Sequence, residues 1–217
     1  WKALGPSAPL AVSRFNAQDL ANTAWSFAPL AFLHAPLLDS TSAAALPRIS
    51  EFTAQNISAT AWSYATLPLG AEPLFHALAA AAIPRISLFE PQSIANLAWA
   101  CAALGFAHAR PPPAGNAQVA TLVSNFKLQE LANLAWSFAK LDMCDSPLLT
   151  AISSESIARI SDCTPFDIAN IAWSFATLGV LDDPLFKALS AQALATIKDF
   201  GPQDIMNIAW AFAKLDI

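Results

Sequence analysis

The stretch DIANIAWSFATL, from Asp167 to Leu178, decides the fold because near copies of it recur along the whole chain. In each copy a tryptophan follows an alanine and is itself followed by Ala three residues later and Leu five residues later. Successive copies are 37 residues apart, with tryptophans at Trp25, Trp62, Trp99, Trp136, Trp173 and Trp210. The chain has 217 residues, so almost none of it lies outside the array. This regular spacing is typical of a repeat protein.

Each unit contains signals for two helices. Before the tryptophan, Asn16 with Asp19 and Thr164 with Asp167 match an N-cap residue followed by an acidic residue at the third helical position. The first helix is expected to run about fourteen residues, to the Leu five after Trp, where Gly105 or Gly179 ends it. The second helix is expected to begin at a proline and to end just before the next repeat's phenylalanine, with prolines at Pro36, Pro73, Pro147 and Pro184. In the third unit, the prolines between Arg110 and Gly115 are expected to shorten or distort the second helix.

Because one helical pair cannot bury its apolar faces alone, neighbouring pairs must stack. The fold class is therefore predicted to be all-α: an α-solenoid, a right-handed superhelix of stacked helix-turn-helix repeats in a single domain, 1–217. The predicted units are a partial repeat 1–14, repeats 15–51, 52–88, 89–125, 126–162 and 163–199, and a partial repeat 200–217. Since both ends fall inside a repeat, we expect the chain to be an excerpt of a longer array.

Composition excludes several classes of protein. Apolar residues make up 55% of the chain and charged residues 12%, which is unlike a disordered segment. The longest stretch without polar side chains, Leu97 to Ala107, is too short to cross a membrane. The net charge of −5 argues against a simple polybasic nucleic-acid binder. The three cysteines form no CxxC pair, and the three histidines lack the spacing of a metal site. Without a recurring nucleophile, base and orienting group, we expect no enzyme, no cofactor and no metal.

On a helical wheel with Trp at zero, the first helix has three faces. Large apolar residues at positions −5, +2 and +5 share one face, and small residues share the next. Polar residues form an arc that stacking turns into a strip along the solenoid, including glutamine at position −7 in five of the six copies. We interpret the tryptophans, at the border of this arc, as core residues, with stacking on a base as the alternative.

Three positions of the arc are candidates for RNA contact. Position −3 carries Asn22, Asn96, Asn133, Asn170 and Asn207. Position −6 varies between repeats and carries Asp19, Asn56, Ser93, Glu130, Asp167 and Asp204. Position +4 also varies, and its polar members are Thr66, Lys140, Thr177 and Lys214. The alternatives are hydrogen bonding between repeats at −3, helix capping at −6 and simple solvation at +4.

Arginines recur near the end of the second helix, at Arg48, Arg85 and Arg159. Their guanidinium groups are candidates for phosphate contact. The alternative is that they complement the negative end of the helix or pair with a neighbouring acid.

The blocks PQSIANLAWACAALGF and LQELANLAWSFAKLDM resemble the octotricopeptide repeat, and the resemblance extends over six phased copies. This resemblance implies an RNA-binding α-solenoid of chloroplasts or mitochondria, acting in the maturation, stability or translation of organellar RNA. It also implies a soluble protein with a targeting segment outside this chain. We therefore expect single-stranded RNA along the polar strip, roughly one nucleotide per repeat, read at positions −6 and +4. The alternative function is a protein-binding scaffold or structural subunit of a large organellar assembly such as a ribosome, with protein partners or other ribonucleoprotein components along the groove.

Overall fold

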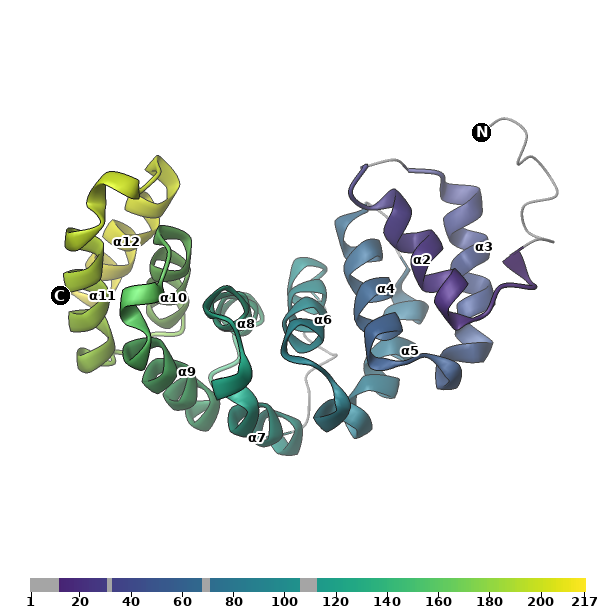
Figure 1. Ribbon diagram of the computed structural model, residues 1–217, viewed down its shortest axis with the longest axis horizontal. Helices are drawn as coiled ribbons and strands as arrows, with labels where there is room; N and C mark the ends of the chain where they lie inside the picture. Colours follow the sequence, from purple (N-terminus) through teal and green to yellow (C-terminus); the bar gives the residue numbers. More distant parts are fainter. Residues whose placement is uncertain (1–11, 31–32, 68–70, 106–112) are drawn as a thin grey trace. The chain divides into compact units, whose positions relative to one another are not determined.

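The computed structural model describes residues 12–30, 33–67, 71–105 and 113–217. In these ranges, pairs of helices recur with the period of the sequence repeat (Figure 1). They contain eleven α-helices and no β-strand. The first helices of the repeats, called the A helices, each begin 37 residues after the previous one. They are α2 (Ala17–Phe27), α4 (Ala54–Thr66), α6 (Pro91–Ala103), α8 (Leu128–Lys140), α10 (Pro165–Thr177) and α12 (Pro202–Leu215).

The ends of the A helices differ slightly from the prediction. α4, α6, α8 and α10 end one residue before the predicted leucine. α2 ends at Phe27 because Pro29 has no N–H with which to continue the helical hydrogen bonds. Gly105 and Gly179 lie just beyond their helices with φ of 68°, as a residue at that position requires. Asp142 and Asp216 take the same left-handed conformation at the equivalent positions.

The second helices, called the B helices, are α3 (Ala35–Ala45), α5 (Glu72–Ala82), α7 (Pro113–Leu122), α9 (Ser146–Ala158) and α11 (Asp183–Ala195). A 3-10 turn follows each one, namely η2 (Leu46–Glu51), η3 (Ile83–Leu88), η5 (Val123–Asn125), η6 (Ile160–Asp162) and η7 (Ile197–Asp199). Pro47 and Pro84 explain the change after α3 and α5, since proline cannot continue the α-helical hydrogen bonds. The described part of α7 has 10 residues and begins within the proline run that was expected to shorten or distort this helix, and that expectation stays a prediction. Part of that run, 110–112, lies outside the described residues.

Contacts divide the chain into two compact units, Trp1–Pro111 and Pro112–Ile217. In the first unit, α2, α4 and α6 pack side by side in one layer, and α3 and α5 cover them (Figure 1). In the second unit, α8, α10 and α12 form one layer while α7, α9 and α11 form the other. The prediction of an all-α solenoid is confirmed. The handedness of the superhelix, the single-domain organisation and the repeat boundaries stay predictions.

The buried face of each A helix is the one predicted to be large and apolar. At position −5, Ile57, Leu131 and Ile168 are completely buried. At position +2, Phe175 is 1% exposed, and buried Tyr64 donates its hydroxyl to the Leu38 carbonyl of α3 at 2.6 Å. Burial raises the pKa of this phenol far above its ordinary value. This face therefore joins the two layers.

The small residues let consecutive A helices approach each other. In α10, Ala169, Ala172 and Ala176 are completely buried, and α10 packs on both α8 and α12. The corresponding face of α12 is exposed, with Met206 at 64%. Small side chains at a helix contact allow close backbone approach, so this face of α10 packs against the following A helix.

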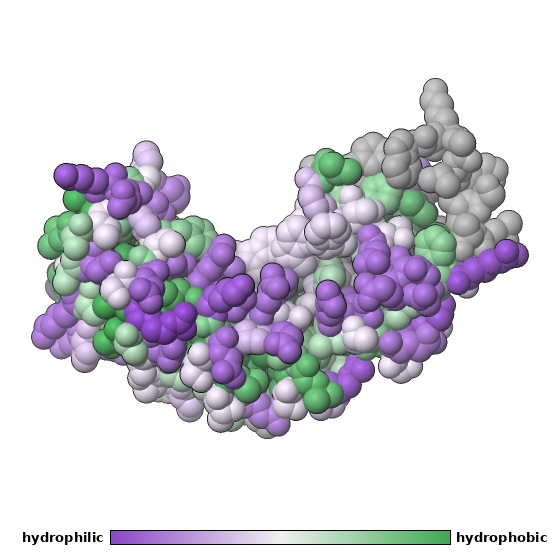
Figure 2. Space-filling model, viewed as in Figure 1, coloured by the Kyte–Doolittle hydropathy of each residue, from purple (hydrophilic) through white to green (hydrophobic). Residues whose placement is uncertain are grey.

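The surface mixes polar and apolar residues. On the face of the molecule seen in Figure 2, hydrophilic and hydrophobic side chains alternate in small areas over both units. Among the described helices, none combines the length and the hydropathy that crossing a bilayer requires.

Candidate nucleic-acid interface

Each A helix has one face that neither the B layer nor the neighbouring A helices cover. This exposed face carries position −7, position −3, the tryptophan and position +4. The interpretation of the tryptophans as core residues is wrong, because none of the six is buried. Trp25 is 54% exposed, Trp210 is 43% exposed, and the other four are partly exposed. On the wheel, the tryptophan lies about 160° from the buried +2 residue, so the core receives the smaller aromatic ring instead.

The tryptophans form rows with defined contacts. The rings of Trp173 and Trp210, from consecutive A helices, have centroids 6.0 Å apart and planes inclined at 32°. The Lys140 ammonium lies 5.8 Å from the centre of the Trp136 ring, one helical turn away. An indole that is both partly exposed and held by a neighbour is a rigid surface on which a planar group can stack.

Amide side chains run beside the tryptophans. Gln18 donates to the Asn22 side chain at 2.8 Å and accepts from the Asn56 amide of the next A helix at 2.9 Å. In α12, Gln203 donates to Asn207 at 2.9 Å. Within the described ranges, the side-chain amides of Asn96, Asn133 and Asn170 make no hydrogen bond, although these residues are only partly exposed. The bond between repeats that was considered for position −3 thus joins positions −7 and −6 instead, at Gln18 and Asn56.

The residues at position −6 cap their own helices, a different role from that of the residues on the exposed face. Asp19, Asn56, Glu130, Asp167 and Asp204 each accept a hydrogen bond from the backbone N–H of their own N-cap residue, at 2.8–3.2 Å. Asn56 and Asp167 are only 2% exposed. The structure therefore uses these side chains as helix caps, the alternative considered for this position. Ser93, too short for this bond, is the exception.

Three of the four serines at position +1 are also turned inward, and Ser26 of the first repeat is exposed. Ser63, Ser137 and Ser174 are completely buried and donate to the carbonyl four residues earlier, at 2.6 Å. The polar arc of the wheel thus splits in two. Positions −6 and +1 are buried or partly buried except at Asp19 and Ser26 of the first repeat, whereas −7, −3 and +4 remain accessible.

Position +4 is accessible in most repeats. Thr66, Lys140 and Lys214 are exposed, and Thr177 is partly exposed. Thr66 donates to the Ser63 carbonyl at 2.9 Å. The Thr177 hydroxyl oxygen is buried and has no partner among the described residues. Lys140 and Lys214 are thus the cations that this position supplies.

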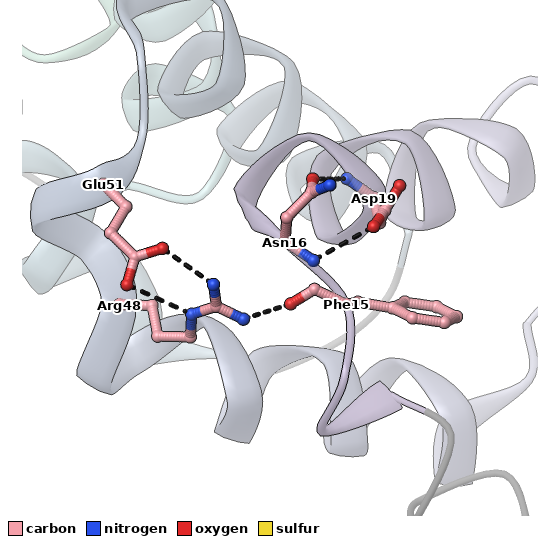
Figure 3. Close-up of polar contacts among 5 residues, drawn as sticks. All are labelled: Phe15, Asn16, Asp19, Arg48 and Glu51. Carbon is pink, nitrogen blue, oxygen red and sulfur yellow. Dashed lines mark hydrogen bonds and ion pairs between the residues drawn. The ribbon is translucent and has the colours of Figure 1, made fainter.

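The recurring arginines connect the end of each of their repeats to its beginning by a hydrogen bond. Arg48, Arg85 and Arg159 each donate to the carbonyl of the phenylalanine that precedes the A helix of the same repeat, 33 residues earlier. Figure 3 shows this contact between Arg48 and Phe15, together with the two bonds from Arg48 to Glu51. Arg159 pairs with Glu155 at 3.2 Å. The predicted phosphate contacts thus fall on side chains that already have internal partners, as the pairing alternative expected.

No metal-binding cluster of His, Cys, Asp or Glu is present in the part of the chain that the structure describes. Cys101, Cys144 and Cys163 are free thiols, and Cys144 is the exposed one. Burial raises the pKa of Cys101 and of Cys163 to about 11, so neither buried thiol is activated as a nucleophile.

Sequence reasoning missed the exposure of the tryptophans. The available signal was the position of the tryptophan on the helical wheel. It lies less than 100° from the amides at −7 and −3 and on the opposite side of the helix from the core residues. Together, stacked helical pairs and an exposed face with aromatic and amide side chains in register define a helical-repeat protein of the α-solenoid class.

The sequence matches the model of the RNA-editing substrate-binding complex 6 protein family twice, over residues 3–146 and 116–217. The chain therefore belongs to this RNA-associated helical protein family. No individual curated protein matches it significantly. Because the match is to this family, the resemblance to the octotricopeptide repeat stays an interpretation of the motifs.

Proposed function

We propose that this chain binds single-stranded RNA along the exposed face of its A helices, as a non-catalytic part of an RNA–protein assembly. The observation that carries the proposal is the row of partly exposed tryptophans repeated every 37 residues. Aromatic platforms in register suit a polymer whose planar bases also repeat. Membership of a family described by its RNA-editing substrate-binding complex supports the same ligand.

In this mechanism the bases stack on the indoles, and the amides beside them contact base edges. Asn96, Asn133 and Asn170 make no side-chain hydrogen bond within the described ranges, so their donors and acceptors are available to a ligand. An unstacked base presents the edges that such amides recognise. Lys140 and Lys214 lie at the same face and reach phosphates or guanine edges.

The proposal gives no RNA contact to the capping residues at −6 or to Arg48 and Arg159, since their polar atoms have internal partners. It therefore rests on positions −7, −3, 0 and +4. With 11 basic against 16 acidic residues in the chain, few phosphates can be neutralised. Affinity should accordingly come from stacking together with the few contacts of Lys140 and Lys214, and its dependence on salt should be shallow.

A second candidate function is that of a protein-binding scaffold within such an assembly. The acidic balance of the chain favours it, because RNA binders ordinarily draw affinity from an excess of Lys and Arg. In that case the amides would contact a peptide backbone, and the tryptophans would anchor a partner's apolar side chains.

We also propose an organellar location, chloroplast or mitochondrion, on the strength of the repeat motifs that resemble the octotricopeptide family. A role in organellar RNA maturation, stability or translation would follow. A fluorescent fusion of the full-length protein, imaged against organelle markers, tests the location.

RNA binding is tested by a fluorescence anisotropy titration of a labelled single-stranded RNA pool at low salt. Trp136→Ala with Trp173→Ala should weaken binding by about thirtyfold or more, since stacking contributes roughly 1–3 kcal/mol per base and two platforms are removed. Lys140→Glu with Lys214→Glu should abolish measurable binding, because it reverses the charge at the exposed face without touching the core.

The matched control is Lys187→Glu with Lys198→Glu, which makes the same charge change at exposed residues of α11 and η7. It should leave the affinity within about twofold of the parent, because those residues are outside the A layer. If the Lys140 and Lys214 variant binds as tightly as the parent, or if the parent binds no RNA at low salt, the scaffold function replaces RNA binding.

A further inference from the structure

In the first unit, an open groove of about 670 Å³ lies at the N-terminal ends of α4 and α6. Leu88 is among its apolar residues, and its polar lining comes from Thr53, Gln55, Arg85, Glu90, Gln92 and Ser93. Gln55 and Gln92 occupy position −7 in consecutive repeats, so the groove opens at the edge of the exposed amide strip. Three features distinguish it from the equivalent places in other repeats.

The first feature is the uncapped start of α6. In α2, α4, α8, α10 and α12, the third helical residue accepts a hydrogen bond from the N-cap N–H. In α6 this residue is Ser93, and the N-cap residue Glu90 supplies no side-chain bond either. Across the described A helices, α6 alone therefore lacks both halves of the capping arrangement. Because Pro91 has no N–H, the unpaired donors at this end are the N–H groups that follow it, and Gln92 and Ser93 line the groove.

The second feature is Ser93 itself. Its side chain is 8% exposed and lines the groove, and its hydroxyl makes no hydrogen bond with any residue the structure describes. Although the residue as a whole is largely covered, its hydroxyl oxygen is not among the fully buried side-chain atoms and is open to the groove. This group is therefore poised to donate to a ligand in the groove.

The third feature is that Arg85, unlike Arg48 and Arg159, forms no ion pair within the described ranges. Arg48 pairs with Glu51, and Arg159 pairs with Glu155. The residues at the equivalent positions around Arg85 are Leu88 and Ala81, neither of which has a charge. Arg85 donates Nε to the Ala81 carbonyl at 2.9 Å and one terminal nitrogen to the Phe52 carbonyl at 3.2 Å. Its other terminal nitrogen has no partner in the described ranges.

An arginine that forms no ion pair, an uncapped helix N-terminus and a serine hydroxyl without a hydrogen-bond partner are groups that can bind a phosphate oxygen. The Gln55 and Gln92 amides add neutral donors at the rim. The carboxylate of exposed Glu90 opposes a dianion more strongly than a monoanion, which favours a phosphodiester over free phosphate. Leu88, 72% exposed, offers an apolar contact for the adjoining ribose.

We propose that this groove binds one phosphate group, with the RNA backbone as its source and free phosphate as the alternative source. This inference refines the proposed function, and it rests on that function only for the identification of RNA as the source of the phosphate. A phosphodiester here would anchor the strand beside α4 and α6 while its bases lie along the exposed face.

Two variants restore what neighbouring repeats contain. Ser93→Asn supplies a neutral cap like that of Asn56, which should complete α6 while removing the free donors. Leu88→Glu supplies the carboxylate that Glu51 provides for Arg48. Both should keep the fold. The matched control is Leu194→Glu, which introduces the same charge at a leucine that is also 72% exposed, in the second unit.

Two measurements are made on each variant. The first is RNA affinity by anisotropy across a salt series, and the second is the shift in melting temperature on replacing chloride by inorganic phosphate at equal ionic strength. Ser93→Asn and Leu88→Glu should weaken RNA binding by about tenfold, in line with loss of a charge-assisted bond. The salt slope should flatten by about 0.7, the value for one phosphate contact on a single strand. Leu194→Glu should change neither quantity.

The two measurements together show whether the groove binds phosphate and whether that phosphate belongs to RNA. Loss in the RNA measurement supports the RNA backbone as the source. An unchanged RNA affinity with a lost phosphate stabilisation supports the groove with free phosphate as its ligand. If both measurements match the parent in both variants, the groove is not a phosphate site, even if the parent binds RNA. If the parent binds no RNA, the proposed function fails, and the melting measurement alone decides the groove.

Discussion

Two polar faces of the same A helix have opposite roles, and α10 shows both. Asp167 and Ser174 lie on the face toward the preceding helix, where they are 2% and 0% exposed and bond to the backbone of their own helix. Asn170 lies on the exposed face, and its amide makes no hydrogen bond within the described ranges. Asp167 and Asn170 are about 60° apart on the helical wheel. The difference teaches that a polar side chain in a solenoid has to be placed relative to the neighbouring repeat before a role is assigned to it.

The largest effect is expected from the core beneath both faces. Phe175→Ala should destabilise the chain by about 3–5 kcal/mol, because it empties a fully buried ring position. Trp173→Ala, from the same helix, should cost roughly 1–2 kcal/mol despite the larger side chain, since its ring is partly exposed. Urea unfolding followed by circular dichroism measures both. An equal or larger loss of unfolding free energy for Trp173→Ala would show that the tryptophans are core residues.

An intermediate effect is expected on the covered face. Ser174→Leu should cost about 1–3 kcal/mol, because it inserts volume into the contact between α8 and α10. Ser174→Ala is the control and should be close to neutral, since Ala100 and Ala211 occupy the same position in other repeats. Thermal unfolding tests the pair. A tolerated leucine at 174 would mean that this face is open.

A smaller effect is expected from the cap. Asp167→Ala should cost about 1 kcal/mol by leaving the Thr164 N–H without its acceptor. Asp167→Asn should retain most of the stability, because Asn56 already serves as this cap in α4. Asn170→Ala, on the exposed face, should change stability by less than about 0.5 kcal/mol. If Asn170→Ala costs as much as Asp167→Ala, the contrast between the two faces fails.

The smallest effect is expected from an exposed ion pair outside both faces. The hydrogen bond and charge of Arg48 lower the pKa of Glu51 below its ordinary value of 4.5. A carboxyl group with a lowered pKa in the folded state stabilises the chain above pH 4.5, and this contribution is lost as the pH falls through the folded value. Carboxyl NMR titration of Glu51 should show the low pKa, and Arg48→Gln should return it toward normal. An ordinary pKa in the parent would show that the pair does not persist in solution.

Much of the fold could be predicted from the sequence, because the 37-residue spacing, the proline positions and the capping residues are local signals. The site was less predictable. The wheel grouped Asp167, Asn170 and Ser174 in one polar arc, since it describes a single helix and contains no neighbour. Whether a polar residue is covered depends on where the preceding A helix packs, which is set by the small residues of another repeat. For the same reason, Arg48 and Arg159 resembled phosphate ligands until their carbonyl and carboxylate partners within the same repeat were seen.

The bond from Arg159 to the Phe126 carbonyl has a consequence for how such arrays grow. Both partners lie within one 37-residue block. A duplicated block would therefore contain both the donor and the acceptor of this hydrogen bond and would need no matching change in its neighbours. Blocks with Leu122 or Thr196 at the arginine position lack this bond and depend more on adjacent blocks. Gene duplication should therefore spread arginine-containing blocks more readily, while the others persist only where flanking blocks already support them.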